Sequence, residues 1–460
     1  MNILILGYGI EGKSVENYFK HQTTLKPTAI DILDHFQKEE LLFKDFSNYD
    51  LIFRTPSIPP KFIPAPEEKI TSVTKYFFDN CPCPIIGVTG TKGKGTTCTI
   101  IKDILTEISV HKQASPNVYL LGNIGTPALD ILPKLKKTDI VIYELSSFQL
   151  WDLKKSPSIS VVLRLEPDHL DVHESFSEYL QAKQNIVNFQ TKSDYCIFFG
   201  PNKNTQNLVQ ETPAKKLPYP CKTVLLNADE TSEKTSILSA ILSHLQVPGN
   251  HNREDAEAAL LASYAYSKKY QSFSGNFSSF LKAFQPELSS ALKNFRALPH
   301  HIEFVRELNS VKYYDDSFST VLPSLEAALN AFPSSPIVLI AGGKDKGFDL
   351  APAKQLIFSR HNLIKAVLIG EIAPKLAQGE DPQKYVHCGT DFELAIKTAQ
   401  RLAESYLNTA EANSDTCLID AKPKITPPVV LLSPCASSFD MFQSYKQRGD
   451  IFKKIVNNLS

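Results

Sequence analysis

The residues best suited to chemistry lie in one glycine-rich stretch, Gly90-Thr-Lys-Gly-Lys-Gly-Thr-Thr97. Backbone N–H groups of such a turn can surround an anion, and Lys94 could reach the terminal phosphates of a nucleotide. Gly95 stands where a hydroxyl residue usually follows the lysine, so Thr96 is the predicted Mg²⁺ ligand. An ordinary turn with a solvated lysine is the alternative. The residues predicted to bind ATP or GTP here are Gly90, Thr91, Gly93, Lys94, Gly95, Thr96 and Thr97.

The segments on both sides of this turn have the patterns that a phosphate-binding loop (P-loop) requires. Residues 85–88 form an apolar run that is typical of a buried strand. After the turn, Ile101, Ile104, Leu105 and Ile108 recur with the spacing of one helix face. A strand followed by a helix places the turn at a helix N-terminus, where the helix dipole favours an anion.

Three further groups follow the P-loop on successive predicted elements. Glu144 lies at the carboxyl end of the strand predicted from the apolar run 140–142, His169 follows the predicted strand 161–165, and Lys183 lies in a helix-like run. Ligands collect at the carboxyl ends of parallel strands. Each residue has an ordinary alternative, as a helix cap, a structural histidine or a solvated lysine. Their succession after a P-loop favours one shared site.

A second glycine motif opens the chain. The apolar residues 2–6 precede Gly7-Tyr-Gly9-Ile10-Glu-Gly12, and a predicted second strand ends at Asp34. This pattern is typical of a Rossmann unit that binds a nucleotide, with the acid near a ribose or a base. A plain tight turn is the alternative.

Alternating strand and helix patterns predict a parallel α/β fold throughout. We expect three domains: a Rossmann-like N-terminal domain at residues 1–84, a central P-loop ATPase domain with a mostly parallel sheet at 85–297, and a Rossmann-like C-terminal domain at 298–460. The polar, proline-bearing stretch 200–223 is predicted to be a surface loop, and the similar stretch 405–428 an excursion or a flexible loop.

The amino-acid composition limits the expected cellular location of the protein and the kinds of partner that it binds. The chain has 460 residues, which corresponds to about three domains. Lys+Arg and Asp+Glu both number 49, so no net charge attracts nucleic acid or a membrane. The eight cysteines include no Cys-x-x-Cys pair, and Cys81 and Cys83 are interpreted as incidental. With neither an export signal nor a long apolar segment, we expect a cytoplasmic protein that binds neither nucleic acid nor membranes.

Taken together, these residues resemble the Mur ligases. The matching motifs run in order along the chain: Gly-Asn-Ile-Gly at 122–125, Glu-Leu-Ser-Ser-Phe-Gln at 144–149, Asp-His-Leu-Asp at 168–171, His-Asn at 251–252, Leu-Pro-His at 298–300, Gly-Gly-Lys-Asp-Lys-Gly at 342–347 and Ser-Phe-Asp-Met-Phe at 438–442. The runs 144–149 and 433–442 are most similar to the members that add D-glutamate.

The resemblance implies an ATP-dependent ligase of peptidoglycan precursor synthesis that is expected to be monomeric. The carboxylate of UDP-N-acetylmuramoyl-L-alanine attacks the γ-phosphate and gives an acyl phosphate. The amine of D-glutamate then displaces phosphate and leaves an amide. This chemistry requires neutralisation of phosphate charge rather than covalent help from the protein.

The resemblance also implies roles for individual residues. Lys94, Glu144, His169 and Lys183 are the expected catalytic residues. Thr96 and Glu144 would hold one Mg²⁺, and His169 and Lys183 a second. An ammonium cannot ligate a hard cation, so Lys183 is expected to be carbamylated to N6-carboxylysine. The remaining expected contacts are Asn252, Asp255, His301 and Asp316 for ATP, Gly9, Ile10, Asp34, Asn123 and Ser146 for the UDP substrate, and Thr320, Lys346, Ser438, Phe439 and Tyr445 for D-glutamate.

Five positions depart from the family pattern. Lys92 replaces the usual asparagine of the P-loop, Gly95 replaces a hydroxyl residue, and His301 replaces a common arginine. Ser57 replaces a glycine, and Phe318 stands where a lysine is often found. None of these changes removes a group that the chemistry requires.

Alternative functions share parts of this pattern. Folylpolyglutamate synthases have the same central chemistry but are not expected to carry the motif at residues 7–12. Other Mur ligases differ in the acceptor motifs. A P-loop switch or a non-catalytic binding protein would have no obvious use for Glu144, His169 and Lys183, and an inactive homologue is a further alternative.

Overall fold

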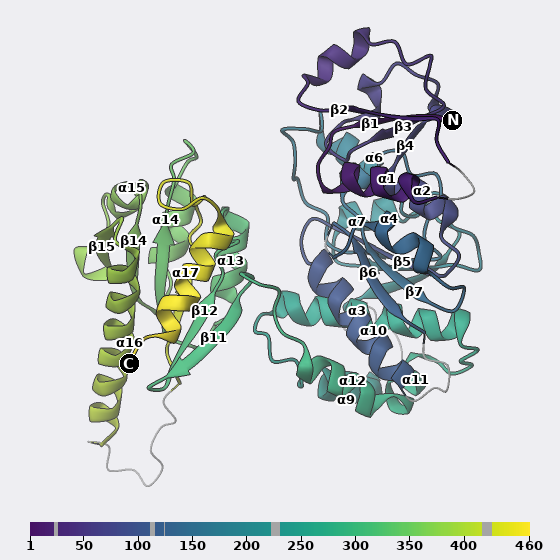
Figure 1. Cartoon of the computed structure of the whole chain (residues 1–460). Helices are drawn as coiled ribbons and strands as arrows, with labels where there is room; N and C mark the ends of the chain where they lie inside the picture. The colour runs from purple at the N-terminus through teal and green to yellow at the C-terminus, as the bar shows by residue number, and fades with distance from the viewer. Residues whose placement is uncertain (23–25, 111–115, 124, 222–230, 416–425) are drawn as a thin grey trace. The chain divides into compact units, whose positions relative to one another are not determined.

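The computed structural model describes the chain except residues 23–25, 111–115, 124, 222–230 and 416–425 (Figure 1). The described residues form an α/β structure with three sheets, which confirms the predicted fold class. The chain divides into two compact units, Met1–Leu245 with Arg253–Asn294 and Gln246–Asn252 with Phe295–Ser460. The first two sheets belong to the first unit and the third sheet to the second. None of the described helices is both long and apolar enough to cross a membrane.

The first sheet is parallel and has the strand order β2-β1-β3-β4. Its elements are β1 (Asn2–Leu6), α1 (Ile10–Lys20), β2 (Ala29–Leu33), η1 (Lys38–Phe43), β3 (Leu51–Arg54), η2 (Pro60–Phe62), η3 (Glu67–Lys69), β4 (Ile70–Ser72) and α2 (Val73–Asn80). The turn after β1 requires glycine, because Gly7 has φ +87° and a Cβ there would lie 2.5 Å from Thr55 Oγ1.

The second sheet is also parallel, with the order β10-β9-β8-β5-β7-β6. Its strands are β5 (Ile85–Thr89), β6 (Val118–Gly122), β7 (Ile140–Glu144), β8 (Ile159–Val162), β9 (Tyr195–Phe199) and β10 (Lys215–Tyr219). Its helices are α3 (Lys94–Val110), α4 (Ala128–Ile131), η4 (Leu132–Lys134), α5 (Ser147–Leu150), α6 (Phe176–Gln184), α7 (Lys203–Leu208), α9 (Thr231–Leu242), α10 (Asn250–Tyr270), α11 (Phe277–Ala283) and α12 (Gln285–Asn294).

The prediction of a surface loop at 200–223 was wrong for much of this stretch, and residues 222–223 lie outside the described chain. This stretch contains α7 and the edge strand β10, which includes Pro218. A proline is tolerated in an edge strand because only one side of that strand pairs with a neighbour.

The third sheet has the order β11-β12-β16-β13-β14-β15. Its strands are β11 (Glu303–Leu308), β12 (Val311–Asp315), β13 (Ile337–Gly342), β14 (Leu363–Ile369), β15 (Tyr385–Gly389) and β16 (Val429–Leu432). Its helices are α13 (Leu322–Asn330), α14 (Ala351–Phe358), α15 (Ala373–Ala377), η6 (Pro382–Lys384), α16 (Phe392–Asp415) and α17 (Tyr445–Asn457). The expectation of parallel strands throughout was wrong at one edge, because β11 pairs antiparallel with β12.

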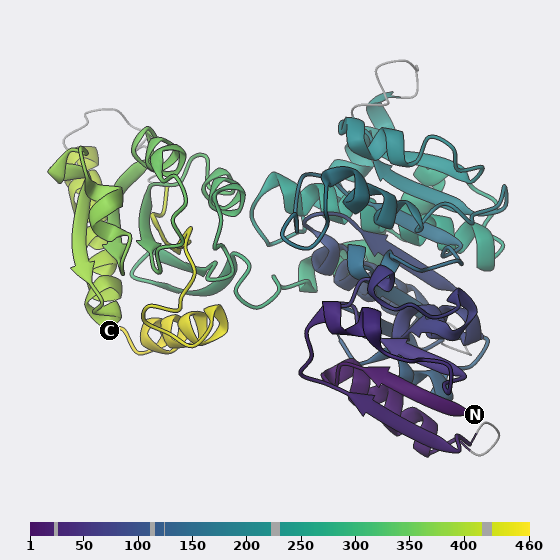
Figure 2. The same cartoon turned by 90° about the horizontal axis from the view of Figure 1, so that it is seen from above.

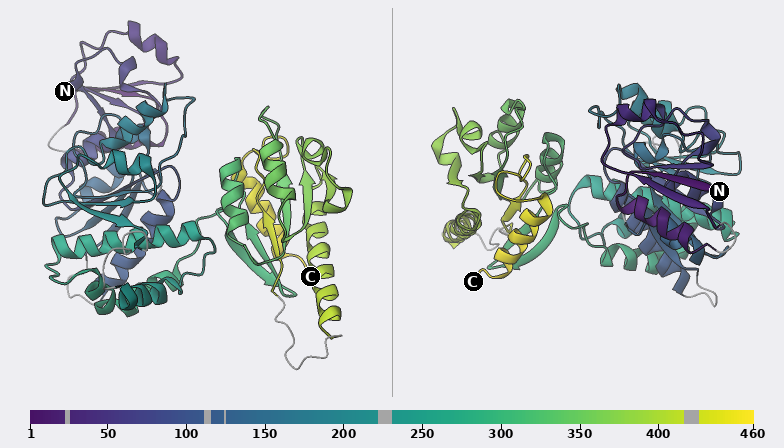
Figure 3. Two further views of the ribbon diagram at one scale, coloured as in Figure 1. Left: turned by 180° about the vertical axis from the view of Figure 1, so that it is seen from behind. Right: turned by 45° about the horizontal axis from the view of Figure 1, so that its top comes forward.

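Helices cover both faces of the third sheet. Apolar residues of α13, α14 and α15 share one core with the sheet, and those of α16 and α17 share another. Figure 3 shows α16 as the long helix of this unit. It extends to Asp415, so the predicted loop at 405–428 was wrong for its first part, and residues 416–425 lie outside the described chain.

Figure 2 shows the N-terminal elements of the first unit next to its central elements. The first and second sheets share one hydrophobic core in this unit. Phe53 and Phe77 from the first sheet and its helices join Val141 and Leu150 in this core. A buried ion pair reinforces the contact, because Arg54, which ends β3, donates to Asp152 Oδ2 at 2.9 Å and Oδ1 at 2.5 Å.

We predict that Arg54→Met destabilises the first unit by about 3–5 kcal/mol, because it leaves the buried Asp152 carboxylate without its cation. The double variant Arg54→Met/Asp152→Leu is expected to recover much of this loss, since both charges are then absent. Urea unfolding measures both free energies. Equal losses in the single and double variants would contradict the interpretation.

Candidate active site

The P-loop is a tight turn between β5 and α3. Gly93 has φ +85°, and a Cβ at this position would lie 2.4 Å from Asp255 Oδ1. Only glycine fits there, because the buried Asp255 carboxylate from α10 fills the space beside the turn. Thr91 fixes the start of the turn, since its hydroxyl donates to the carbonyl oxygen of Glu166 at 3.0 Å. Thr96 lies half-buried in the first turn of α3.

Lys94 lies against the inside of this turn. Its Nζ donates to the carbonyl oxygens of Gly90 and Thr91, both at 3.1 Å. Burial lowers the pKa of Lys94, and the carboxylate of Glu144 opposes that effect. The ammonium therefore lies within the loop where a terminal phosphate would bind, whereas the side chain of Lys92 is exposed.

Glu144 ends β7, the strand beside β5. Pairing of Val88 with Glu144 places this carboxylate next to the P-loop. Its Oε1 accepts from Asn123 Nδ2 at 3.2 Å, and its buried Oε2 has no hydrogen-bond partner among the described residues. Burial raises the pKa of Glu144, and the positive charge of Lys94 lowers it. A buried carboxylate oxygen without a partner fits a hard divalent cation, which prefers oxygen ligands.

Lys183 reaches the same loop from α6. Its side chain is buried, and its Nζ donates to Thr89 Oγ1 at 3.1 Å and to the carbonyl oxygen of Gly90 at 3.0 Å. Burial holds the pKa of Lys183 well below its usual value, and the charge of Lys94 lowers it further. The structure thus brings Lys94, Glu144 and Lys183 together around the P-loop, although their carboxylate and amine groups come from three different elements.

His169 lies in the loop that precedes α6. It has φ +54°, and its backbone N–H donates to Asp168 Oδ1 at 3.1 Å. Its side chain is 49% exposed and contacts the ring of Phe148, with 5.0 Å between ring centroids. The imidazole is therefore accessible to a ligand, but the structure shows no hydrogen bond between it and Lys183.

His173 supports this loop, although no motif in the sequence pointed to it. The ring of His173 is buried, stacks on Phe148 at 5.4 Å and lies 4.7 Å from the ring of Trp151. Its Nε2 lies 2.9 Å from Ser147 Oγ, and burial lowers its pKa. Because Phe148 contacts both histidines, His173 helps to position His169. Its polar neighbours in the sequence give no sign of this burial.

The predicted UDP-substrate residues lie in the first unit. Gly9 precedes α1, and Ile10 at its start is 76% exposed. Asp34 follows β2 and accepts from the backbone N–H of Tyr8 at 3.2 Å, so the acid and the glycine turn are adjacent. Ser146 caps α5 by accepting from the backbone N–H of Gln149, which is the ordinary role of a serine at a helix start.

The predicted D-glutamate residues follow three neighbouring parallel strands of the second unit. Thr320 follows β12, Lys346 follows β13 and Ser438 follows β16. The carboxyl ends of these strands meet at one edge of the sheet. Lys346 is exposed and Phe439 is 68% exposed, whereas Tyr445 packs on Phe318 with 5.1 Å between ring centroids.

The predicted ATP contacts divide between the two units. Asn252 lies in the first turn of α10, where its Nδ2 donates to the carbonyl oxygen of Pro248 at 2.6 Å. His301 packs on the ring of Phe318 at 4.1 Å, so two departures from the family pattern are in contact. Asp316 is buried and accepts from Ile302 N at 3.2 Å and Ser433 Oγ at 2.8 Å.

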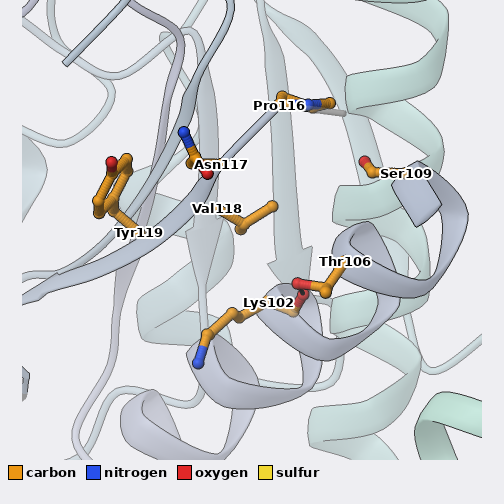
Figure 4. A pocket seen from close by; sticks show the side chains of 7 residues that line it. All are labelled: Lys102, Thr106, Ser109, Pro116, Asn117, Val118 and Tyr119. Carbon is orange, nitrogen blue, oxygen red and sulfur yellow. Dashed lines mark hydrogen bonds between the residues drawn. The ribbon is translucent and has the colours of Figure 1, made fainter. Parts of the chain in front are cut away.

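A separate cavity of about 350 Å³ lies between α3 and the edge strand β6 (Figure 4). Its lining residues are Lys102, Thr106, Ser109, Pro116, Asn117, Val118 and Tyr119. These residues belong to the second half of α3 and the start of β6, whereas the P-loop precedes α3 and Asn123 follows β6. The cavity is therefore not part of the site around Lys94.

We predict that the contribution of Asp316 to stability depends on pH. Burial raises its pKa to about 8, whereas the unfolded value is about 3.9. Because the folded-state value is the higher one, its contribution to stability is complete below about pH 4 and is lost as the pH rises through about 8. The unfolding free energy of the wild type, relative to Asp316→Asn, is expected to fall over this interval in urea titrations. Parallel pH profiles would contradict the assignment.

The chain is similar to known proteins of one family. Residues 88–263 match the family described as the Mur ligase middle domain. The UDP-N-acetylmuramoylalanine–D-glutamate ligase of Acetivibrio thermocellus is 31% identical, over 99% of this chain and 96% of the relative. The same ligase of Clostridium kluyveri is 34% identical, over 91% of this chain and 85% of the relative.

Solved structures show the same fold at low sequence identity. MurF from Acinetobacter baumannii has a TM-score of 0.54 at 13% identity, over 99% of this chain and 84% of that chain. A pseudomurein peptide ligase type C from Methanothermus fervidus has a TM-score of 0.52 at 14% identity, with both chains fully covered. Together with the identity to curated ligases over nearly the whole sequence, these findings establish that this chain belongs to the Mur ligase family.

Proposed function

We propose that this protein joins D-glutamate to UDP-N-acetylmuramoyl-L-alanine at the expense of ATP, in peptidoglycan precursor synthesis. The observation that carries the proposal is the convergence of Lys94, Lys183 and Glu144 on the P-loop. The names of the curated relatives support D-glutamate as the acceptor.

The reaction has two steps, and the residues act mainly on charge. The alanyl carboxylate attacks the γ-phosphorus of ATP, the bond to ADP breaks, and an acyl phosphate forms. The amine of D-glutamate then attacks the acyl carbon, loses a proton, and expels phosphate. Lys94 in the P-loop would offset the phosphate charge during the first step, and the backbone N–H groups of the turn would hold the phosphates.

Two Mg²⁺ sites fit the donors in the first unit. Thr96 and Glu144 would hold one ion, for which the partnerless Oε2 of Glu144 is the supporting observation. His169 and a carbamylated Lys183 would hold the other. Bound Mg²⁺ supplies positive charge that offsets the phosphates and the approaching carboxylate.

The buried amine of Lys183 supports its carbamylation. Burial lowers the pKa of Lys183 and so favours its neutral amine, which is the form that can act as a nucleophile. Its nitrogen attacks CO₂, loses a proton and becomes a carbamate, whose oxygens suit a hard cation. The pairing of Lys183 with a second cation, Lys94, favours this loss of positive charge.

The three predicted domains would divide the substrates. Residues 1–84 would bind the UDP substrate through Gly9, Ile10 and Asp34, with Asn123 and Ser146 from the central domain near its reacting end. Residues 85–297 would bind the ATP phosphates. Residues 298–460 would contact ATP through His301 and Asp316, and the acceptor through Thr320, Lys346, Ser438, Phe439 and Tyr445.

The direct test is phosphate release from Mg·ATP in the presence of UDP-N-acetylmuramoyl-L-alanine. We expect turnover with D-glutamate, and none with L-glutamate, other amino acids or no acceptor. Turnover with a different amino acid would overturn the acceptor assignment and keep the ligase chemistry. A folded protein without turnover on any acceptor would overturn the proposed function.

Variants of the P-loop lysines test the role of Lys94. We predict that Lys94→Ala lowers kcat by about 10²-fold or more, because it removes a positive charge at the transferring phosphate. Lys92→Ala is the matched control, since this exposed lysine lies in the same turn. It is expected to retain most of the activity, and equal losses in the two variants would contradict the assignment.

The carbamylation of Lys183 can be tested by a measurement that does not depend on turnover. With ¹³C-labelled bicarbonate, the wild type is expected to show a carbamate carbon signal by NMR that Lys183→Arg lacks. The arginine variant keeps a positive charge but cannot be carbamylated, and its activity is expected to fall by about 10²-fold or more. The absence of the signal in an active wild type would rule out the carbamate.

A further inference from the structure

Two thiols are in contact in the turn that joins the first sheet to the P-loop strand. Cys81 follows α2, Pro82 comes next, and Cys83 precedes β5. The two Sγ atoms lie 3.6 Å apart, and Cys81 Sγ lies 3.5 Å from the carbonyl oxygen of Cys83. Both are among the seven free thiols of the described chain.

The two thiols differ in exposure and in acidity. Cys81 is half-buried, and Cys83 is 8% exposed. Hydrogen bonding with Cys83 lowers the pKa of Cys81, and the positive charge of Lys155 adds to this effect. The same hydrogen bond, together with burial, raises the pKa of Cys83. Cys81 is therefore the more accessible thiol and the one that forms a thiolate more readily.

Lys155 is held in place beside this turn. Its Nζ donates to the carbonyl oxygen of Phe78, in the last turn of α2, at 2.7 Å. The lysine thus supplies its charge from a fixed position near the end of the helix that Cys81 follows. A positive charge beside a thiolate is the usual feature of a reactive cysteine.

We propose that Cys81 and Cys83 form a redox-active pair that reacts with low-molecular-weight disulfides and closes into a reversible intramolecular disulfide. This inference concerns the turn between the two sheets and does not depend on the ligase reaction.

The chemistry is ordinary thiol–disulfide exchange. The Cys81 thiolate attacks one sulfur of a disulfide RSSR, whose S–S bond breaks and releases one thiolate. Cys81 then carries no charge, so the main cause of the raised pKa of Cys83 is gone. Cys83 loses its proton and attacks Cys81 Sγ, which releases the second thiolate. Two protein thiols are oxidised, one RSSR is reduced, and the released thiolates take up the two protons.

A disulfide between Cys81 and Cys83 would affect the elements next to this turn. A disulfide requires about 2.05 Å between the sulfurs, so the pair would have to approach by about 1.5 Å. Cys83 belongs to the core shared by the first two sheets, and the adjacent Pro84 accepts from the backbone N–H of Val141 in β7 at 3.0 Å. The bond would therefore connect the end of α2 firmly to the strand that leads into the P-loop.

The test is thiol mapping of the folded protein after treatment with oxidised glutathione. Trypsin releases residues 76–92 as one peptide that contains both thiols and no other cysteine. We expect this peptide to lose two hydrogen atoms and to regain them with dithiothreitol. Cys435 is the internal control, because it is half-buried and burial raises its pKa to about 11, and it is expected to stay free.

Single variants test the order of the steps. Cys83→Ser is expected to accumulate a stable glutathione adduct at Cys81, and Cys81→Ser is expected to react at least tenfold more slowly. Adding Lys155→Gln to Cys83→Ser is expected to slow adduct formation severalfold. Two free thiols in the treated folded protein, under conditions that oxidise the unfolded chain, would overturn the proposal. Equal rates for the two serine variants would also overturn it.

Discussion

The carbonyl oxygen of Gly90 accepts hydrogen bonds from two lysine amines, Lys94 at 3.1 Å and Lys183 at 3.0 Å. Two ammonium groups so close together repel each other in a poorly solvated site. The burial of Lys183 resolves this conflict by favouring its neutral form. An anion that binds in the loop would interact with the positive charge of Lys94. It would thereby reduce the repulsion between the Lys94 and Lys183 amines.

The rest of the first unit maintains this arrangement. β5 and β7 are neighbours in register, so the loop and Glu144 lie at the same edge of the sheet. Asp255 fills the space beside Gly93, and the ring of His173 supports Phe148 next to His169. These contacts come from elements far apart in the sequence, and they hold the short loop in place.

Local patterns were sufficient to predict the P-loop, because a strand, a glycine turn and a helix are each encoded within a few residues. The position of Glu144 followed from the rule that ligands collect at strand ends. The pairing of Arg54 with Asp152 could not be predicted, since it joins residues 98 positions apart in the sequence. The edge strand β11 was missed because its residues are only partly buried and lack a clear apolar alternation. α7 and β10 were missed because α7 consists mostly of polar residues and β10 contains lysines and a proline. Such residues are also typical of surface loops.

The core shared by the first two sheets has a consequence for folding. Phe53 and Phe77 are almost completely buried in this core, and the ring of Phe77 packs on Tyr143 of β7, beyond the P-loop, with 5.5 Å between ring centroids. A newly synthesised N-terminal segment would expose these rings until the second sheet had formed. The first glycine motif and the P-loop are thus expected to gain their structure within one cooperative unit of hydrogen exchange, rather than as two independently folding modules.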